Sequence, residues 1–232
     1  MIEIDKVKVN GFKDAARGMR NSFNSWTKGD SDYVDGDGLG IRDVELMKKL
    51  SCGGSSHAKF RRFITVTCDI LAPLYWWKEF DTYKVGTVAN SCSTMHTITE
   101  KEFEWSDFSF EHLGVHAKNT FDYADNKVYL QDITYQNLWV DKTAKVLLEG
   151  LNQARWMYLK EEDPDVKKQY WWQIIQLLPT SYNQKRTVLL NYEVLSSMYL
   201  DRKNHKLDEW RTFCEWIEKD LPYAKGIIFA DI

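Results

Sequence analysis

The chain has 232 residues, a formal net charge of −3 and 44% hydrophobic residues, which predicts a single domain over residues 1–232 with a substantial core. No long basic run is present, so a general surface for duplex nucleic acid is excluded, although a single nucleotide needs only a few local cations. No apolar segment resembles a signal peptide or a run of about 18 residues that could span a bilayer, so we expect a cytoplasmic protein without membrane contact.

The N-terminal half alternates between predicted strands and helices. We expect a strand over residues 2–9, a helix over 12–20, a polar loop over 21–40 and a helix over 41–50. The clearest strand runs from Phe60 to Leu71, because its apolar and polar residues alternate. Ala72-Pro73 ends this strand, since proline cannot donate to the hydrogen-bond ladder, and a helix follows over Leu74–Phe80.

The C-terminal half is predicted to be helical from about residue 132. Asp163 and Pro164 favour a helix start, and that helix should end at Pro179. Two more helices follow; their apolar stripes are Val188, Tyr192, Leu195 and Tyr199, and then Leu207, Trp210, Cys214, Ile217 and Leu221. The pattern predicts an α/β (α+β) fold. Cysteine and histidine do not occur at zinc-ligand spacing, so we expect no structural metal.

Three polar stretches are candidates for a functional site. The first is His57 with Arg61 and Arg62, which is either a cationic rim for an anionic ligand or a solvated strand start. The second lies between Trp76 and His96 and contains Lys78, Glu79, Tyr83, Lys84, Asn90, Cys92 and Ser93. Such polar strings are also common in ordinary turns.

The third stretch follows Leu178-Pro179 and contains Asn191, Arg202 and His205. Arg202 lies 11 residues after Asn191, about three helical turns, so both side chains can share a face if the helix is continuous. A guanidinium suits a carboxylate, a phosphate or a pyrimidine edge. The alternative is a charged helix end in water.

In this order, the three stretches resemble the flavin-dependent thymidylate synthase family (ThyX). The resemblance covers most of the chain and is carried by Ala72-Pro73, Leu74–Phe80, Leu178-Pro179, Asn191, Arg202, His205 and Glu209. It implies a central, mostly antiparallel sheet and a homotetramer that binds FAD and dUMP at subunit interfaces. In the family, a folate donates a methylene group and the reduced flavin delivers the hydride.

The resemblance also assigns expected roles to individual residues. Arg202 would hold and polarise the uracil base and is the expected catalytic residue. The expected flavin contacts are His57, Tyr83, Lys84, Asn90 and Asn191. The expected nucleotide contacts are Lys78, Glu79, Cys92 and Ser93, together with Arg202. Cys92 could act as a nucleophile or be an ordinary small residue.

The signature loop departs from the family pattern. Thr82-Tyr83-Lys84 stands where the family has Arg-His-Arg, and Asn90-Ser91 replaces an Asn-Glu pair at a shifted position. The loop stays polar between bulky aromatic residues, which suggests a rebuilt site, and a phage or other viral origin would suit so divergent a relative. Three functions therefore remain open: a flavin-dependent enzyme acting on a pyrimidine nucleotide, a non-catalytic nucleotide-binding protein, and an oligomeric interaction protein without a ligand.

Overall fold

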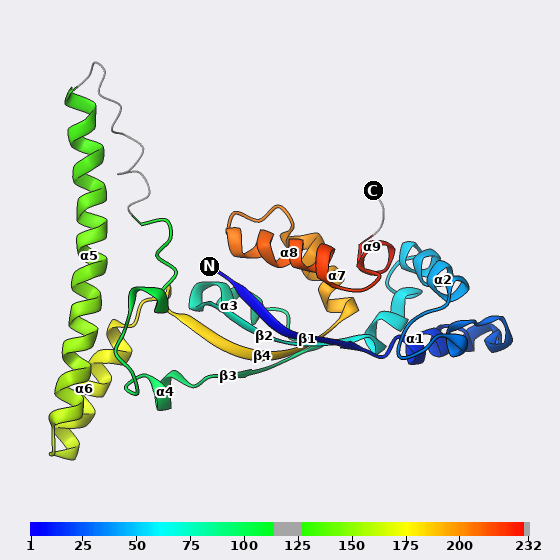
Figure 1. Ribbon diagram of the computed structural model, residues 1–232, viewed down its shortest axis with the longest axis horizontal. Coiled ribbons are helices and arrows are strands. Elements are labelled where there is room, and N and C mark those ends of the chain that lie inside the picture. The colour runs from blue at the N-terminus through cyan, green and yellow to red at the C-terminus, as the bar shows by residue number, and fades with distance from the viewer. Residues whose placement is uncertain (114–126, 230–232) are drawn as a thin grey trace. The chain divides into compact units, whose positions relative to one another are not determined.

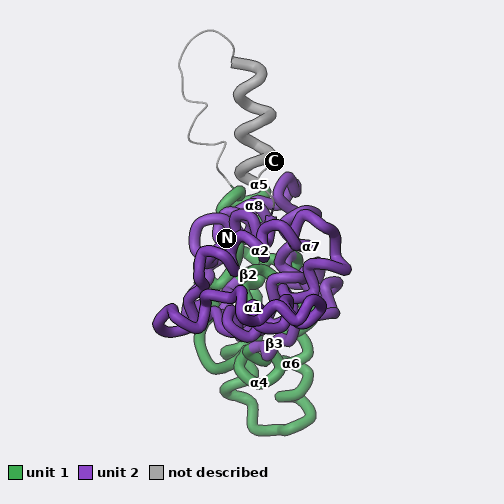
Figure 2. Tube along the Cα trace, turned by 90° about the vertical axis from the view of Figure 1, so that its right-hand side faces the viewer, with its two compact units in different colours: residues 1, 72–75, 92–184 green, residues 2–71, 76–91, 185–232 purple. Residues whose placement is uncertain are grey.

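The computed structural model describes residues 1–113 and 127–229, and only the backbone of 127–139. The chain divides into two compact units whose segments alternate along the sequence (Figure 2). Unit 1 comprises Met1, Ala72–Tyr75 and Cys92–Gln184, and unit 2 comprises Ile2–Leu71, Trp76–Ser91 and Lys185–Ile232. That residues 1–232 form one domain stays a prediction.

A four-stranded sheet organises unit 2 (Figure 1). Its strands are β1 (Glu3–Asn10), β2 (Thr65–Pro73), β4 (Asn183–Asn191) and β3 (Thr87–Ser91), in that spatial order. The pairs β1–β2 and β3–β4 are antiparallel. The mixed α/β class with a mostly antiparallel sheet is therefore confirmed.

Helices α7, α8 and α9 lie over one face of this sheet (Figure 1). The helices of unit 2 are α1 (Phe12–Met19), α2 (Ile41–Cys52), most of α3 (Leu74–Phe80), α7 (Tyr192–Arg202), α8 (Asp208–Asp220) and α9 (Ala224–Ile227). Val66, Cys68 and Ile70 of β2 are buried, whereas the alternate residues Thr67 and Asp69 are partly exposed. The two-residue period of the strand thus separates a core face from a polar face.

The polar loop between α1 and α2 is held by two carboxylates, of which Asp43 is buried and Asp37 is exposed. Asp43 Oδ1 accepts a hydrogen bond of 2.6 Å from Arg20 Nε, and Asp43 Oδ2 accepts one of 2.6 Å from the Ser31 hydroxyl. Asp37 accepts from the backbone N–H groups of Gly11 and Phe12 at the start of α1. Buried charges need such partners, so the loop has a defined shape.

Unit 1 contains a helical hairpin and an aromatic cluster. Its helices are α4 (Thr94–Thr97), α5 (Lys127–Lys160), α6 (Pro164–Leu177) and the first residues of α3. The buried cluster includes Phe103, Phe108, Leu151 and Ile174. Asp163 Oδ1 accepts from the backbone N–H groups of Asp165 and Val166, so the predicted start of α6 is confirmed.

Two predicted elements are wrong in part. Val188 lies in β4 and not on a helix with Tyr192, because Val188 and Leu190 are alternate buried residues of a strand. The segment Ala58–Phe63 is a 3₁₀-helix, so β2 begins at Thr65 and not at Phe60. Within the described residues, no helix combines the length and the apolar character needed to cross a membrane.

Candidate functional site

Arg202 lies in the last turn of α7 and is bonded to the segment that follows β2. Its Nη1 donates a hydrogen bond of 2.6 Å to Glu79 Oε2 on α3, and its Nε donates one of 2.9 Å to Tyr83 Oη. The side chain of Arg202 is 19% exposed. The predicted meeting of Arg202 with the loop after Ala72-Pro73 is therefore present within unit 2.

Glu79 is the centre of this cluster. Besides Arg202, Trp210 Nε1 donates to Glu79 Oε2 at 3.1 Å, and His205 Nε2 lies 3.4 Å from the same oxygen. The backbone N–H of Leu207 donates to His205 Nδ1 at 3.2 Å, which places the imidazole proton on Nε2, facing Glu79. Several donors thus converge on one carboxylate oxygen, and they hold it in place.

Tyr83 completes the cluster on the other side of Arg202. Its hydroxyl donates a hydrogen bond of 3.2 Å to Asp201 Oδ2 while it accepts from Arg202. Burial raises the pKa of the Tyr83 phenol, and the hydrogen bond from Arg202 partly offsets this rise. The guanidinium also lies over two aromatic rings, with its Cζ 4.9 Å from the centre of Trp210 and 5.6 Å from that of Tyr83.

The cluster keeps a defined bonding capacity. Within the described residues, Arg202 donates side-chain hydrogen bonds through Nε and Nη1 and not through Nη2. Nη2 is therefore available to a ligand. Glu79 and Asp201 place negative charge beside Arg202. A neutral carbonyl group therefore suits Nη2 better than a dianionic phosphate, which the two carboxylates would repel.

Asn191 has a structural role at the start of α7. Its Oδ1 accepts a hydrogen bond of 2.9 Å from the backbone N–H of Val194, which is the geometry of an N-cap. Its Nδ2 packs against Gly86, where a Cβ atom would lie only 2.6 Å away. Asn191 is thus at the edge of α7 and not on a helix face shared with Arg202, and its flavin contact stays a prediction.

The remaining predicted residues are not all placed together. Lys78 and Lys84 are exposed, and each is the chain neighbour of a residue bonded to Arg202. Asn90 is exposed on β3. His57 instead lines a cavity of about 900 Å³ that is bounded by other residues, including Phe23 and Phe63.

Cys92 and Ser93 belong to unit 1. Cys92 is exposed, and its Sγ lies 3.7 Å from Thr97 Oγ1. The Cys92 carbonyl accepts a hydrogen bond of 2.9 Å from Gln184 Nε2. Their predicted contact with a nucleotide is not tested by this arrangement, and no three His, Cys, Asp or Glu side chains of the described residues form a group that could hold a metal ion.

The comparison with solved structures gives the fold. Two crystal structures of ThyX from Helicobacter pylori, each with FAD and dUMP, match with a TM-score of 0.61. One is 18% identical and the match covers 99% of this chain and 97% of that one; the other is 19% identical with 98% and 97% covered. The chain has a ThyX-like fold. No family model and no curated protein matches the sequence.

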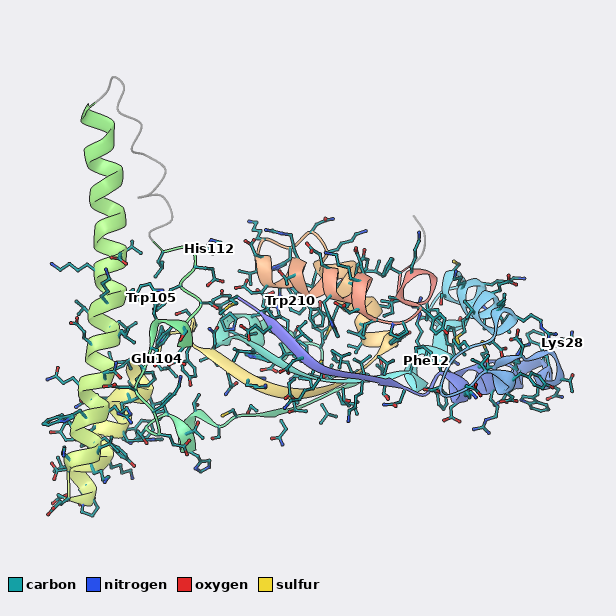
Figure 3. The ribbon with its side chains drawn as sticks, in the orientation of Figure 1. Phe12, Lys28, Glu104, Trp105, His112 and Trp210 are labelled. Atoms are coloured by element: carbon teal, nitrogen blue, oxygen red, sulfur yellow. The ribbon has the colours of Figure 1, made fainter. Side chains whose placement is uncertain are left out.

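Two members of the Arg202 cluster, Trp210 and Asp201, are not among the predicted site residues. Trp210 was assigned to the core stripe of the last helix, and it is fully buried as expected. Its indole N–H, however, bonds to Glu79, and Asp201 binds the Tyr83 hydroxyl. The signal for Trp210 was available, because a buried indole N–H usually has an acceptor. Figure 3 labels Trp210 on α8.

The residues predicted to contact a flavin are dispersed within one chain. Within one chain, the polar groups of Tyr83 and Asn191 are already bonded or packed. His57 lines a cavity that none of the other predicted flavin contacts lines. The residues predicted to contact a flavin therefore do not gather around one site in a single chain, and the cluster at Arg202 is the better-formed candidate site.

Proposed function

We propose that this protein binds a pyrimidine nucleotide of the dUMP type, with Arg202 donating to a carbonyl group of the base. The observation that supports this is the fixed guanidinium with Nη2 open and its charge balanced by Glu79. Because Glu79 offsets its charge, the guanidinium can donate to a neutral base edge and does not pair preferentially with the phosphate of the nucleotide. The ThyX structures with similar folds contain dUMP.

The phosphate of the nucleotide would be held by Lys78 and Lys84. Neither ammonium group makes a hydrogen bond or an ion pair with the described residues, and both side chains are exposed. Their chain neighbours Glu79 and Tyr83 hold Arg202, so the same short segment can present cations for the phosphate and fix the group for the base. A lysine binds phosphate as a point charge.

Transfer of a methylene group and a hydride to a uracil base is the catalytic form of this proposal. It would require FAD and a folate, and FAD supplies the hydride when it is bound. Because one chain does not group the predicted flavin contacts, this form also requires a second copy, as in a homotetramer. The alternative is a protein that binds the nucleotide without turnover, and it needs only the Arg202 cluster.

Thermal unfolding with dUMP tests the binding proposal. A ligand at about 100 times its Kd that binds only the folded state adds about 2.7 kcal/mol of stability. We expect dUMP to raise the melting temperature of the wild type and not that of Arg202→Ala. The matched control is Arg17→Ala, since Arg17 is an exposed arginine on α1 that pairs with Asp14 and touches no residue of the Arg202 cluster.

The visible spectrum of the purified protein separates the two forms of the proposal. A flavin absorption band together with the dUMP response supports the enzyme. A colourless protein that still responds to dUMP supports binding without flavin chemistry. A protein without flavin absorption and without a response to dUMP contradicts both forms of the proposal. The function that then remains is that of an oligomeric interaction protein.

A further inference from the structure

A smaller cavity of unit 2 lies between α1 and the polar loop that connects α1 to α2. Its volume is about 330 Å³, which is within the range of about 300–1,000 Å³ that is usual for small-molecule sites. Lys13 and Arg17 line it from α1, and Trp26 and Asp32 line it from the loop. None of the residues bonded to Arg202 lines this cavity.

Several charged groups of the lining already have a partner of opposite charge. Asp43 accepts hydrogen bonds from Arg20 at one carboxylate oxygen, and from the hydroxyl and the backbone N–H of Ser31 at the other. Arg17 Nη2 lies 3.0 Å from Asp14 Oδ1 on the same helix. The charges of Arg17, Arg20 and Asp43 are therefore compensated within the protein.

Two further carboxylates of the loop hold helix ends and do not line the cavity. Asp30 accepts from backbone N–H groups at the start of α2, and Asp37 accepts from backbone N–H groups at the start of α1. Asp35 is exposed and does not line the cavity either. Their negative charges therefore do not enter the space that a ligand would occupy.

Lys13 and Asp32 remain as one cation and one anion of the lining without a charged partner. Lys13 Nζ donates a hydrogen bond of 2.6 Å to the neutral carbonyl group of Val34, and an ammonium group has two further N–H donors. The exposed carboxylate of Asp32 has no hydrogen bond or ion pair within the described residues. Lys13 and Asp32 thus line one cavity without pairing with each other. A ligand that satisfies both carries charges of both signs.

Trp26 and Ala16 add an apolar surface to the same cavity. Trp26 is 50% exposed, so a large part of its ring is open to a ligand. Its Nε1 donates a hydrogen bond of 2.8 Å to Asn21 Oδ1, which holds the indole ring in place. Aromatic rings prefer to pack on one another in offset or edge-to-face arrangements. An aromatic ring on the ligand would therefore suit this surface.

We infer that this cavity binds a free α-amino acid with an aromatic side chain, with its carboxylate at Lys13, its ammonium group at Asp32 and its ring on Trp26. An α-amino acid carries both charges on one carbon atom, so it can meet both groups within a small cavity. A phosphate would be repelled by Asp32, and a polyamine would be repelled by Lys13. This site is separate from the nucleotide site proposed at Arg202 and does not depend on it.

Calorimetric titration of the full chain tests this inference, with phenylalanine as the first probe. Three related probes each lack one group: phenylalanine amide lacks the carboxylate, N-acetylphenylalanine lacks the ammonium group, and glycine lacks the ring. We expect phenylalanine to bind and each of the other probes to bind at least about tenfold more weakly, since each makes only part of the contacts.

Asp32→Asn is the most informative variant, because the Asp32 carboxylate has no partner within the described residues and its loss should not disturb the fold. We expect it to weaken phenylalanine about tenfold through the lost charged contact and to leave N-acetylphenylalanine unchanged. The matched control is Asp35→Asn, which changes an exposed aspartate of the same loop that does not line the cavity, and it should have no effect.

Lys13→Gln tests the other charged contact. It should weaken phenylalanine about tenfold and leave phenylalanine amide unchanged, whereas a loop loosened by the lost bond to Val34 would weaken both probes. Arg202→Ala should leave phenylalanine binding unchanged, so a failure at the nucleotide site does not affect this result. The inference is overturned if phenylalanine does not bind, if the amide or the N-acetyl derivative binds as tightly, or if Asp32→Asn behaves like Asp35→Asn.

Discussion

Arg202 Nη1 and Glu79 Oε2 are 2.6 Å apart, and this pair links the end of α7 to α3. The same carboxylate oxygen accepts from the indole of Trp210. A ligand that meets Arg202 therefore meets a group that is already oriented, so little of the binding free energy is lost in ordering the side chain. The pair also determines which ligand chemistry Arg202 can accept, since its charge is offset.

Replacing Glu79 should destabilise the protein more than replacing an ordinary surface glutamate. Glu79→Gln keeps the size but weakens the bonds from Arg202 and Trp210, so we expect the free energy of unfolding to fall by about 1 kcal/mol. The loss is small because the Glu79 side chain is 34% exposed and water screens the pair. Urea unfolding measures this change.

The control for Glu79 is Glu215→Gln. Glu215 pairs with Lys219 one helical turn away, and both side chains are at least 60% exposed. We expect a change below about 0.5 kcal/mol there. Equal losses for the two variants would show that the Glu79 cluster adds nothing beyond a surface ion pair.

Asn191 and Gly86 should be energetically coupled. Asn191→Ala removes the N-cap of α7 and should cost about 1 kcal/mol. Gly86→Ala should cost more than 1 kcal/mol, since Gly86 has φ +84° and a new Cβ would lie 2.6 Å from Asn191 Nδ2. In the double variant the clash is absent, so the loss should be smaller than the sum of the two. Strict additivity in urea unfolding would contradict this packing.

The four thiols should fall into two classes. Burial, with a smaller contribution from nearby carboxylates, raises the pKa of Cys68 and of Cys214 to about 12. Cys52 and Cys92 are exposed. A thiol reagent at pH 8 should therefore label Cys52 and Cys92 in the native protein and all four thiols in urea. Rapid labelling of Cys68 in the native protein would contradict its buried position in β2.

Acid should weaken the loop between α1 and α2 through Asp43. Burial raises the pKa of the Asp43 carboxyl, but hydrogen bonds from the Ser31 hydroxyl, the Asp30 backbone N–H and Arg20 outweigh it, and the pKa lies below the ordinary value of 3.8. A lowered folded-state pKa contributes stability above the unfolded-state value, and this stability is lost as the pH falls through the folded-state pKa. Stability should therefore decline as the pH falls below about 3.8.

Asp43→Asn should reduce this acid-dependent decline and lower stability at neutral pH. The side chains of Arg20 and Asp43 are 7% and 2% exposed, so removing the carboxylate leaves a buried arginine charge unpaired, at a cost of about 3 kcal/mol. Asp14→Asn is the control, because its pair with Arg17 is exposed. Unfolding of both variants in urea at neutral and acid pH measures the difference, and parallel pH profiles would exclude Asp43 as the titrating group.

Local signals in the sequence were sufficient for several elements and not for others. The Asp163 cap and Pro164 predicted α6, and the period-two pattern predicted β2 after Thr65. Val188 of β4 was predicted to lie on a helix with Tyr192, because the two residues are four apart and fit both periods. Its strand state depends on pairing with β3, a long-range contact that no local pattern contains.

Some residues of the candidate site could be predicted from the sequence and others could not. Glu79, Tyr83 and Arg202 were expected in one site, and in the structure Glu79 and Tyr83 each accept a hydrogen bond from Arg202. The resemblance placed them along the chain, but it could not give Trp210 as the donor to Glu79, because that bond requires α8 to pack against α3. The roles of these residues toward a nucleotide or a flavin stay predictions.

Calorimetric titration with dUMP of the wild type, Arg202→Lys and Arg17→Lys tests the central proposal most directly. Lysine keeps the positive charge of Arg202, but it lacks the planar fork in which separate nitrogens reach Glu79 and Tyr83 and leave a third for a base carbonyl. We expect dUMP to bind the wild type and Arg17→Lys equally and to lose at least about tenfold in affinity with Arg202→Lys. Equal affinity for all three proteins, or no binding to any of them, would contradict the assignment of Arg202 as the group that holds the base.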